Sequence, residues 1–269
     1  MLTLMAVHAH PDDEVMTTGG VFAHYAAQGV RTVLVTCTNG EQGDGPGGVK
    51  PGQPGHDEEA VAKLRLTELR ESAAHLGISD VEPLGYRDSG MDGWDGNSHE
   101  RAFANVPVDE AAERVAELMR KYRPQVVVTY DENGGYGHPD HIQAHRVAAR
   151  AVELSGVPAK FYYAATTLSS MQAAYDGMVA AGMDVSEWQG FEEWCTPDDK
   201  VNAVIDTSAY VGHKAKAIGA HASQGDSAFF LGLPPDTQHL MFSEEAFTLV
   251  SSSVPAHDGV EDDLFHGLR

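Results

Sequence analysis

The first 38 residues carry two apolar runs separated by a helical pattern, and this arrangement restricts the folds open to the chain. Residues 2–7 are mostly apolar and residues 31–38 are rich in β-branched side chains, so both are typical of buried strands. Between them, apolar residues recur at helical spacing from Val15 to Ala26, ahead of Gly29. The pattern predicts a βαβ unit with two parallel strands.

The same alternation continues along the chain. Further helices are expected over residues 57–76, 108–122, 139–154, 171–181 and 208–222, and further strands over 81–86, 125–130, 160–166 and 201–205. An added strand at one edge of the sheet is expected over residues 242–251. The chain therefore predicts an α/β fold, a single Rossmann-like domain over residues 1–269 with a mainly parallel sheet flanked by helices.

Two segments fall outside this pattern. Residues 39–56 hold seven glycines and three prolines, so a loop is expected there. This loop would overhang the edge where open α/β sheets bind ligands, and both a lid over a substrate and a plain insertion fit it. The acidic tail from about residue 254 is expected to be loose, apart from Leu264 and Phe265.

The charge balance excludes several kinds of partner. Eighteen Lys and Arg residues stand against 40 Asp and Glu residues, a net charge of −22. A surface this acidic repels phosphate backbones and anionic lipids, so we expect neither nucleic acid nor a membrane as a partner. The two cysteines are far apart, and no apolar run approaches the roughly 20 residues of a membrane span. A cytoplasmic protein is expected, and nothing in the sequence specifies its oligomeric state.

Two clusters of polar residues directly follow predicted strands. Residues 10–14 (HPDDE) place an imidazole and three carboxylates side by side, and residues 137–141 (GHPDH) place two imidazoles three residues apart. Such a concentration of carboxylates repels itself unless a positive charge lies within it. Because parallel strands end at the same edge of a sheet, the clusters are expected to meet there. Two histidines and one carboxylate leave a coordination position open, which is typical of a catalytic zinc. Taken singly, the acidic residues also suit a helix N-terminus.

Three other classes of protein were weighed against an enzyme with a catalytic zinc. A nucleotide-binding module is disfavoured because residues 8–20 contain no G-x-G-x-x-G motif and their carboxylates would repel a pyrophosphate. The same ligand set also suits iron(II) in an oxygenase, although an all-β scaffold is usual there. A sugar-binding protein with a structural metal would lack an open coordination position.

Several motifs together resemble the PIG-L/LmbE family of metal-dependent de-N-acetylases. The resemblance is carried by residues 10–14 and 137–141, and extends to residues 65–69 (RLTEL), 87–91 (RDSGM) and 221–224 (HASQ). It implies a Rossmann-like fold and a hydrolase that uses zinc, or iron(II), to remove an acyl group from a 2-amino-sugar conjugate.

The resemblance also implies roles for individual residues. His10, Asp13 and His141 would be the zinc ligands, and Asp12 would be the general base. His138 and Tyr136 would meet the developing oxyanion or the leaving amine, with Asp140 orienting His138. The implied substrate contacts are Arg65, Asp88, Met91 and Asp44.

Within this family the sequence resembles two actinobacterial mycothiol enzymes at once. Residues 87–91 and Gly137 are similar to the deacetylase that acts on N-acetylglucosaminyl-inositol. Residues 131–136 and 41–44 are similar to the amidase that acts on mycothiol S-conjugates. Three substrates therefore stay open: N-acetylglucosaminyl-inositol, a mycothiol S-conjugate, or an amino sugar of a natural product.

Overall fold

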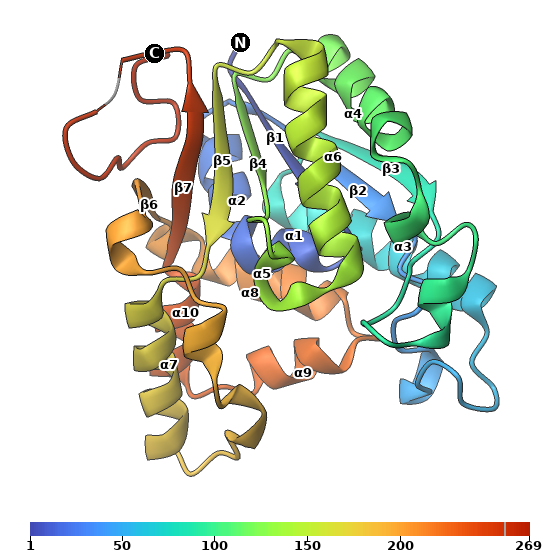
Figure 1. The fold of residues 1–269 in the computed structure, drawn as a ribbon. Helices are drawn as coiled ribbons and strands as arrows, with labels where there is room; N and C mark the ends of the chain where they lie inside the picture. Colours follow the sequence, from blue (N-terminus) through green and yellow to red (C-terminus); the bar gives the residue numbers. More distant parts are fainter. Residues whose placement is uncertain (256) are drawn as a thin grey trace.

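One seven-stranded sheet organises the chain in the computed structural model, which describes residues 1–255 and 257–269 (Figure 1). The strand order is β3-β2-β1-β4-β5-β7-β6. The bounds are β1 Thr3–His8, β2 Arg31–Thr38, β3 Asp80–Tyr86, β4 Val126–Thr129, β5 Lys160–Ala165, β6 Ala203–Asp206 and β7 Glu244–Ser252. The first five strands in this order pair in parallel, which confirms the predicted α/β fold with a mainly parallel sheet.

The last strand does not lie at the edge of the sheet as expected. β7 pairs antiparallel with both β5 and β6, so β6 is the edge strand. However, β6 is short and covers only Glu244–Phe247 of β7. The remaining residues of β7, which are mostly exposed, pair on one side only. Because these residues are mostly exposed, the sequence of β7 resembles that of an edge strand.

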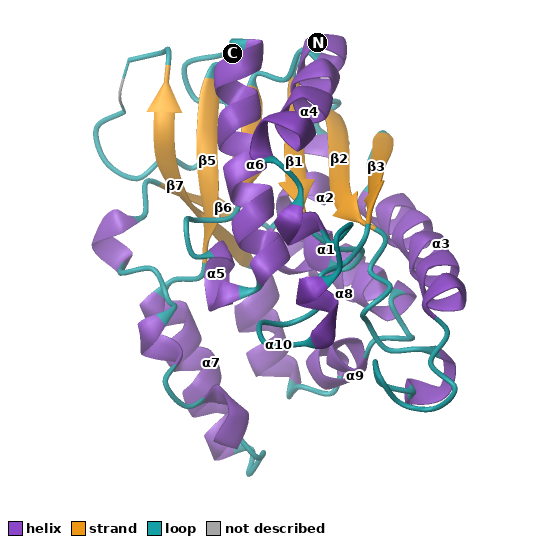
Figure 2. Ribbon diagram, turned by 45° about the vertical axis from the view of Figure 1, so that its right-hand side comes forward, coloured by secondary structure: helices purple, strands orange, loops and turns teal. Residues whose placement is uncertain are grey.

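Helices cover both faces of the sheet, and the residues of β1 show why. Leu4 and Ala6 point into a core shared with α2 (Gly19–Ala27), α3 (Glu58–Leu76) and α8 (Val211–Ala220). Met5 and Val7 point into a second core, shared with α4 (Val108–Tyr122) and α6 (Pro139–Ser155). Figure 2 shows these two layers on either side of the strands. A strand buried on both faces is largely apolar, as β1 is from Leu4 to Val7, because it packs against helices on each side.

The helix expected from Val15 is broken in two at Thr18. α1 (Asp13–Thr17) ends there and α2 begins at Gly19. The carboxylate of Glu245 accepts hydrogen bonds from the backbone N–H groups of Gly20 and Val21 at 2.8 Å each, and pairs with Lys214 at 2.7 Å. An anion at a helix N-terminus accepts hydrogen bonds from the N–H groups that have no partner within the helix. Glu245 of β7 therefore stabilises the start of α2 at this break.

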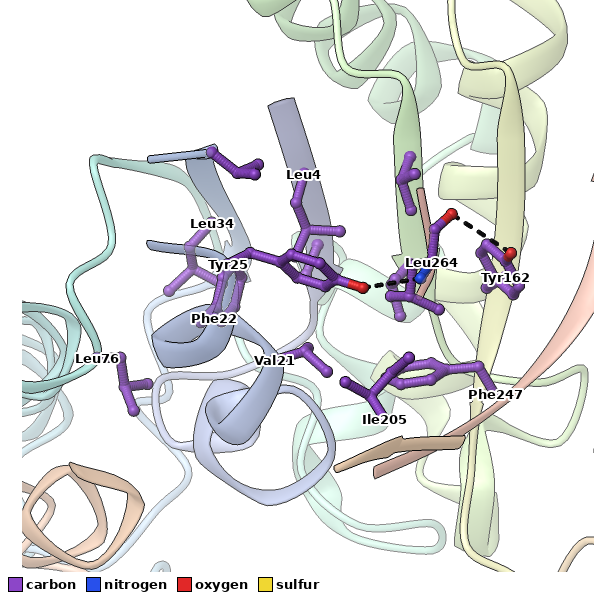
Figure 3. Close-up of a cluster of buried hydrophobic side chains, with 14 of the residues drawn as sticks. Leu4, Val21, Phe22, Tyr25, Leu34, Leu76, Tyr162, Ile205, Phe247 and Leu264 are labelled. Carbon is purple, nitrogen blue, oxygen red and sulfur yellow. Dashed lines mark hydrogen bonds between the residues drawn. The ribbon is translucent and has the colours of Figure 1, made fainter. Parts of the chain in front are cut away.

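The acidic tail is packed against the protein more tightly than expected. Leu264 and Phe265 are buried, as predicted, and the backbone N–H of Leu264 donates to the Tyr25 hydroxyl at 2.7 Å (Figure 3). Glu261, which was expected to be loose, is also buried. It accepts hydrogen bonds from Lys160 at 2.8 Å and Tyr162 at 2.5 Å. The prediction failed because the partner cation lies 101 residues away on β5.

The carboxyl edge of the parallel strands is surrounded by loops and short helices. They include α5 (Gly134–Gly137), α7 (Leu168–Ala180), α9 (Gly225–Leu231) and α10 (Pro235–Phe242), of which only α7 was predicted. In Figure 1, α7 and α9 lie beyond this edge. Among the described residues, no helix combines the length and the apolar character needed to cross a membrane.

Replacing Phe265 by Ala is expected to lower the free energy of unfolding by about 3–5 kcal/mol, because a fully buried ring would be lost. Urea unfolding measures the change. The matched control is Val260→Ala in the same tail, where 55% of the side chain is exposed and a change within about 0.5 kcal/mol is expected. Equal, small effects at both positions would show that the tail is not packed on the core.

Candidate active site

Two imidazoles and one carboxylate meet where β1 and β4 end. His10 lies two residues beyond the end of β1, Asp13 begins α1, and His141 lies in the first turn of α6. The Nδ1 atom of His10 and the Nε2 atom of His141 are 3.3 Å apart. Each of these nitrogens is also 3.3 Å from a carboxylate oxygen of Asp13. The two predicted clusters therefore come together, although they are 131 residues apart in the chain.

This triangle fits a divalent metal ion. Ligand atoms bound to zinc at ordinary bond lengths of about 2.0–2.2 Å in a tetrahedron lie about 3.3–3.5 Å from each other. The remaining ring nitrogens are already engaged: Nε2 of His10 is 3.2 Å from Asp140, and Nδ1 of His141 is 3.1 Å from the carbonyl of Gly134. Each histidine thus donates its ring N–H to one of these acceptors. The other ring nitrogen of each histidine then presents a lone pair to the space inside the triangle. His138 lies near His10 and His141 and completes a second group of three that could hold a metal.

Asp140 has a different role from the one the sequence implied. Its carboxylate accepts from Nε2 of His10 and from the backbone N–H of Ser89 at 2.8 Å, and also bonds the Ser89 hydroxyl. Its only bond to His138 is through its backbone N–H, which donates to Nδ1 of that ring at 3.1 Å. The Asp140 carboxylate therefore orients His10, and only the backbone N–H of Asp140 holds His138. Because Asp140 is the second residue of α6, its N–H is free for His138 while its carboxylate reaches back toward β1.

Asp12 stands beside the triangle in a strained conformation. Its φ of 110° lies in the left-handed region, which costs a residue other than glycine about 1–3 kcal/mol. The Asp12 carboxylate accepts a hydrogen bond at 2.8 Å from Arg65, a buried arginine that also holds the carbonyls of Pro11 and Gly40. Burial raises the pKa of Asp12 to about 6, although Arg65 opposes the rise. A carboxylate with a pKa near neutrality suits a general base.

His138 and Tyr136 line the same cleft. Burial, together with the nearby His10 and His141, lowers the pKa of His138 to about 2. The ring is therefore neutral, and since Nδ1 accepts the N–H of Asp140, the proton lies on Nε2. The Tyr136 ring is 54% exposed and its centroid is 5.1 Å from that of His141.

The implied substrate contacts divide into two groups. A cleft of about 1400 Å³ contains the triangle, and Arg65, Asp88 and Met91 line it. Asp88 is itself buried. Although burial alone would raise its pKa, the nearby His10 and Arg65 hold that pKa below its usual value. Asp44 does not line this cleft. Its side chain instead binds Lys50 and the backbone N–H of Gly225, which joins the 39–56 loop to the start of α9.

Other residues at the site were missed from the sequence. Ser89 fixes Asp140, and the Tyr130 ring stacks on His141 with centroids 4.3 Å apart. Ser89 lies in the 87–91 motif after a predicted strand, and Tyr130 ends the predicted strand 125–130; these positions were the available signals. Glu14 was read as a helix-start residue, yet it is fully buried and bonded to His221.

An open group of two imidazoles and a carboxylate, with a further carboxylate at its side, defines a class of protein: metal-dependent hydrolases. Residues 5–152 match the family described as PIG-L: GlcNAc-PI de-N-acetylase. A relative from Acidothermus cellulolyticus, a 1D-myo-inositol 2-acetamido-2-deoxy-alpha-D-glucopyranoside deacetylase, is 42% identical over 99% of this chain and 95% of its own length. The chain belongs to this family and is a hydrolytic deacetylase.

Solved structures share the fold at low sequence identity. The N,N'-diacetylchitobiose deacetylase from Pyrococcus horikoshii has a TM-score of 0.58 at 20% identity, covering 92% of this chain and 83% of its own. The 4-carboxy-2-hydroxymuconate hydratase from Pseudomonas putida has a TM-score of 0.63 at 17% identity, covering 96% and 100%. Because a hydratase shares the fold, the fold alone does not determine the reaction.

Replacing Gly134 by Ala is expected to reduce metal binding and turnover by at least tenfold. The new methyl group would lie 2.6 Å from Cβ of His141 and 2.7 Å from the backbone N of Ile142, so the His141 ring must shift. Metal content after dialysis and the initial rate measure the effect. Gly137→Ala is the matched control, because φ is also positive there (92°) but no neighbour lies within 4 Å. An equal loss in both variants would implicate backbone strain rather than displacement of His141.

Proposed function

We propose that this deacetylase removes the acetyl group from an N-acetylglucosaminyl-inositol, with His10, Asp13 and His141 as ligands of one zinc ion. The mutual 3.3 Å spacing of their ligand atoms beside Asp12 is the observation that carries the proposal. Iron(II) suits the same donors. The substrate is inferred from the Acidothermus relative, which this chain matches over nearly its whole length.

Asp12 is the proposed general base. A bound divalent metal would polarise the amide carbonyl and lower the pKa of the attacking water. Asp12 is next in sequence to a proposed ligand and points its carboxylate toward Arg65, so its other oxygen is free to take the proton of that water. After the tetrahedral stage, the same carboxyl group can return the proton to the leaving amine.

His138 and Tyr136 are proposed to act on the oxyanion. Neutral His138 carries its proton on Nε2, and this N–H can donate to the oxygen that gains charge. The Tyr136 hydroxyl, on the glycine-rich α5 at the mouth of the cleft, can add a second donor. The lowered pKa of His138 makes it a hydrogen-bond donor in this scheme and leaves the return of the proton to Asp12.

The part of the cleft near β3 is proposed to bind the polyol. Arg65 and Asp88 provide a positive and a negative group there, and the half-buried Met91 provides an apolar surface for a sugar ring. Because Arg65 also holds Asp12, substrate contact and base position share one side chain.

Asp12→Asn is expected to keep metal binding and to reduce turnover by about 10²- to 10⁴-fold, since an amide cannot take the proton. The side-chain oxygen of asparagine can still accept the hydrogen bond from Arg65. The variant therefore tests loss of the base without loss of this contact. Asp12→Ala should be similarly inactive. Metal analysis and acetate release measure the two effects, and an Asn variant with wild-type turnover would refute the proposed base.

A substrate panel tests the proposed specificity. Acetate and free amine are expected in equal amounts from N-acetylglucosaminyl-inositol, at a higher kcat/KM than from a mycothiol S-conjugate or an acetylated natural-product amino sugar. Amine assays on all three compounds at one metal loading measure this. Faster hydrolysis of the S-conjugate would identify an amidase, and faster hydrolysis of the natural-product sugar would identify a tailoring enzyme.

A further inference from the structure

Glu14 lies behind the proposed base in a fully buried network. One of its carboxylate oxygens, Oε2, accepts the backbone N–H of Asp12 at 2.9 Å. The other, Oε1, accepts Nε2 of His221 at 2.7 Å and the Ser72 hydroxyl at 2.5 Å. Glu14, His221 and Ser72 each have no exposed surface. The carboxylate thus joins three elements: α1, α3 and the C-terminal end of α8.

The hydrogen bond from the backbone N–H of Asp12 to Glu14 is important because the backbone of Asp12 is strained. Asp12 precedes α1 with φ 110° and ψ −26°, and its own side chain caps no helical N–H group. Its carboxylate is held from one side by Arg65, and its backbone N–H is held from the other by Glu14. A strained conformation persists only where surrounding contacts over-determine it. The carboxylate direction of Asp12 therefore depends on both contacts.

Two buried lysine–glutamate pairs of the protein have different roles. Lys160–Glu261 holds the tail, and Lys214–Glu245 holds the start of α2. Neither contacts Asp12. Glu14 is thus the buried carboxylate whose hydrogen bonds reach the proposed base directly.

We infer that Glu14, held by His221 and Ser72, is a positioning residue that keeps the backbone of Asp12 in its left-handed conformation and so directs the Asp12 carboxylate at the attacking water. This inference rests on the proposed function, in which Asp12 is the base. Glu14 does not touch substrate or metal in this account and acts through Asp12 alone.

The amide of glutamine should replace the Glu14 carboxylate in part. Its oxygen can still accept the N–H of Asp12. Its NH₂ group can donate to the Ser72 oxygen, and to Nε2 of His221 if that ring moves its proton to Nδ1, where the buried N–H has no acceptor among the described residues, so the replacement is incomplete. Glu14→Gln is therefore expected to keep at least a tenth of wild-type kcat. Glu14→Ala should lose about 10- to 100-fold in kcat, the size of effect expected when a reacting group is displaced by about 1 Å.

A double-mutant cycle with Asp12→Asn tests the inference in the metal-loaded, full-length protein. Metal content and KM should stay within about twofold of wild type in Glu14→Ala. In the Asp12→Asn background, Glu14→Ala should change the residual rate by less than twofold, because the group it positions can no longer act. Glu261→Gln is the control for loss of a buried carboxylate, and its kcat should match wild type even if its melting temperature falls.

Three results would overturn the inference: an equal fold-loss from Glu14→Ala in both backgrounds, a loss explained by missing metal, or a Gln variant as slow as the Ala variant. If Glu14→Ala does not fold, Glu14→Asp replaces it, because the shorter side chain cannot reach Asp12 and His221 together. Wild-type turnover in the single variant Asp12→Asn would instead refute the proposed base, and the inference with it. The two failures are thus distinguishable.

Discussion

Compensation of three adjacent carboxylates, of which Glu14 is fully buried and Asp12 and Asp13 are partly buried, is the constraint on which the rest of the site depends. Carboxylates removed from water are costly unless each finds a charge or a set of donors. In this protein each has a separate partner: Arg65 for Asp12, the two imidazoles for Asp13, and His221 for Glu14. Arg65 comes from α3, the imidazoles come from the segment after β1 and from α6, and His221 follows α8. The five residues after β1 therefore determine which distant elements must meet at this edge.

The sheet makes that meeting possible. In the parallel part of the sheet the strands end at one edge, so loops that follow β1, β2, β3 and β4 share one space. His10 follows β1, Gly40 follows β2, Asp88 follows β3 and His141 lies beyond β4. Arg65, from the helix between β2 and β3, is then close enough to contact both Asp12 and Gly40. The topology of the sheet therefore decides which residues meet at the site as much as side-chain chemistry does.

Local patterns predicted the fold and the main clusters well. Apolar runs and helical spacing located the parallel strands and most helices, because the periodicity and length of such a pattern are set by residues close together in the sequence. The 10–14 and 137–141 clusters were recognisable because their residues are adjacent in sequence. Pairings across the chain were not predictable in this way: Glu14 bonds His221 207 residues away, and Glu261 bonds Lys160.

Side-chain direction was the second source of error. Asp140 and His138 are two residues apart, so a carboxylate–imidazole pair was a natural expectation. The start of α6 turns the carboxylate toward His10 and gives His138 the backbone N–H. Asp44 is similar, because its side chain binds Lys50 and the backbone N–H of Gly225 rather than lining the cleft. In both cases the backbone path, which sequence spacing does not specify, decided the contact.

The central claim is that His10, Asp13 and His141 hold one divalent metal ion while His138 stays free to donate. A crystal structure of the metal-loaded protein, with anomalous scattering recorded at the metal edge, tests it directly. The account predicts a single strong peak bonded to Nδ1 of His10, Nε2 of His141 and the Asp13 carboxylate, with Nε2 of His138 unligated. A peak bound by His10, His138 and His141, or none near Asp13, would contradict it.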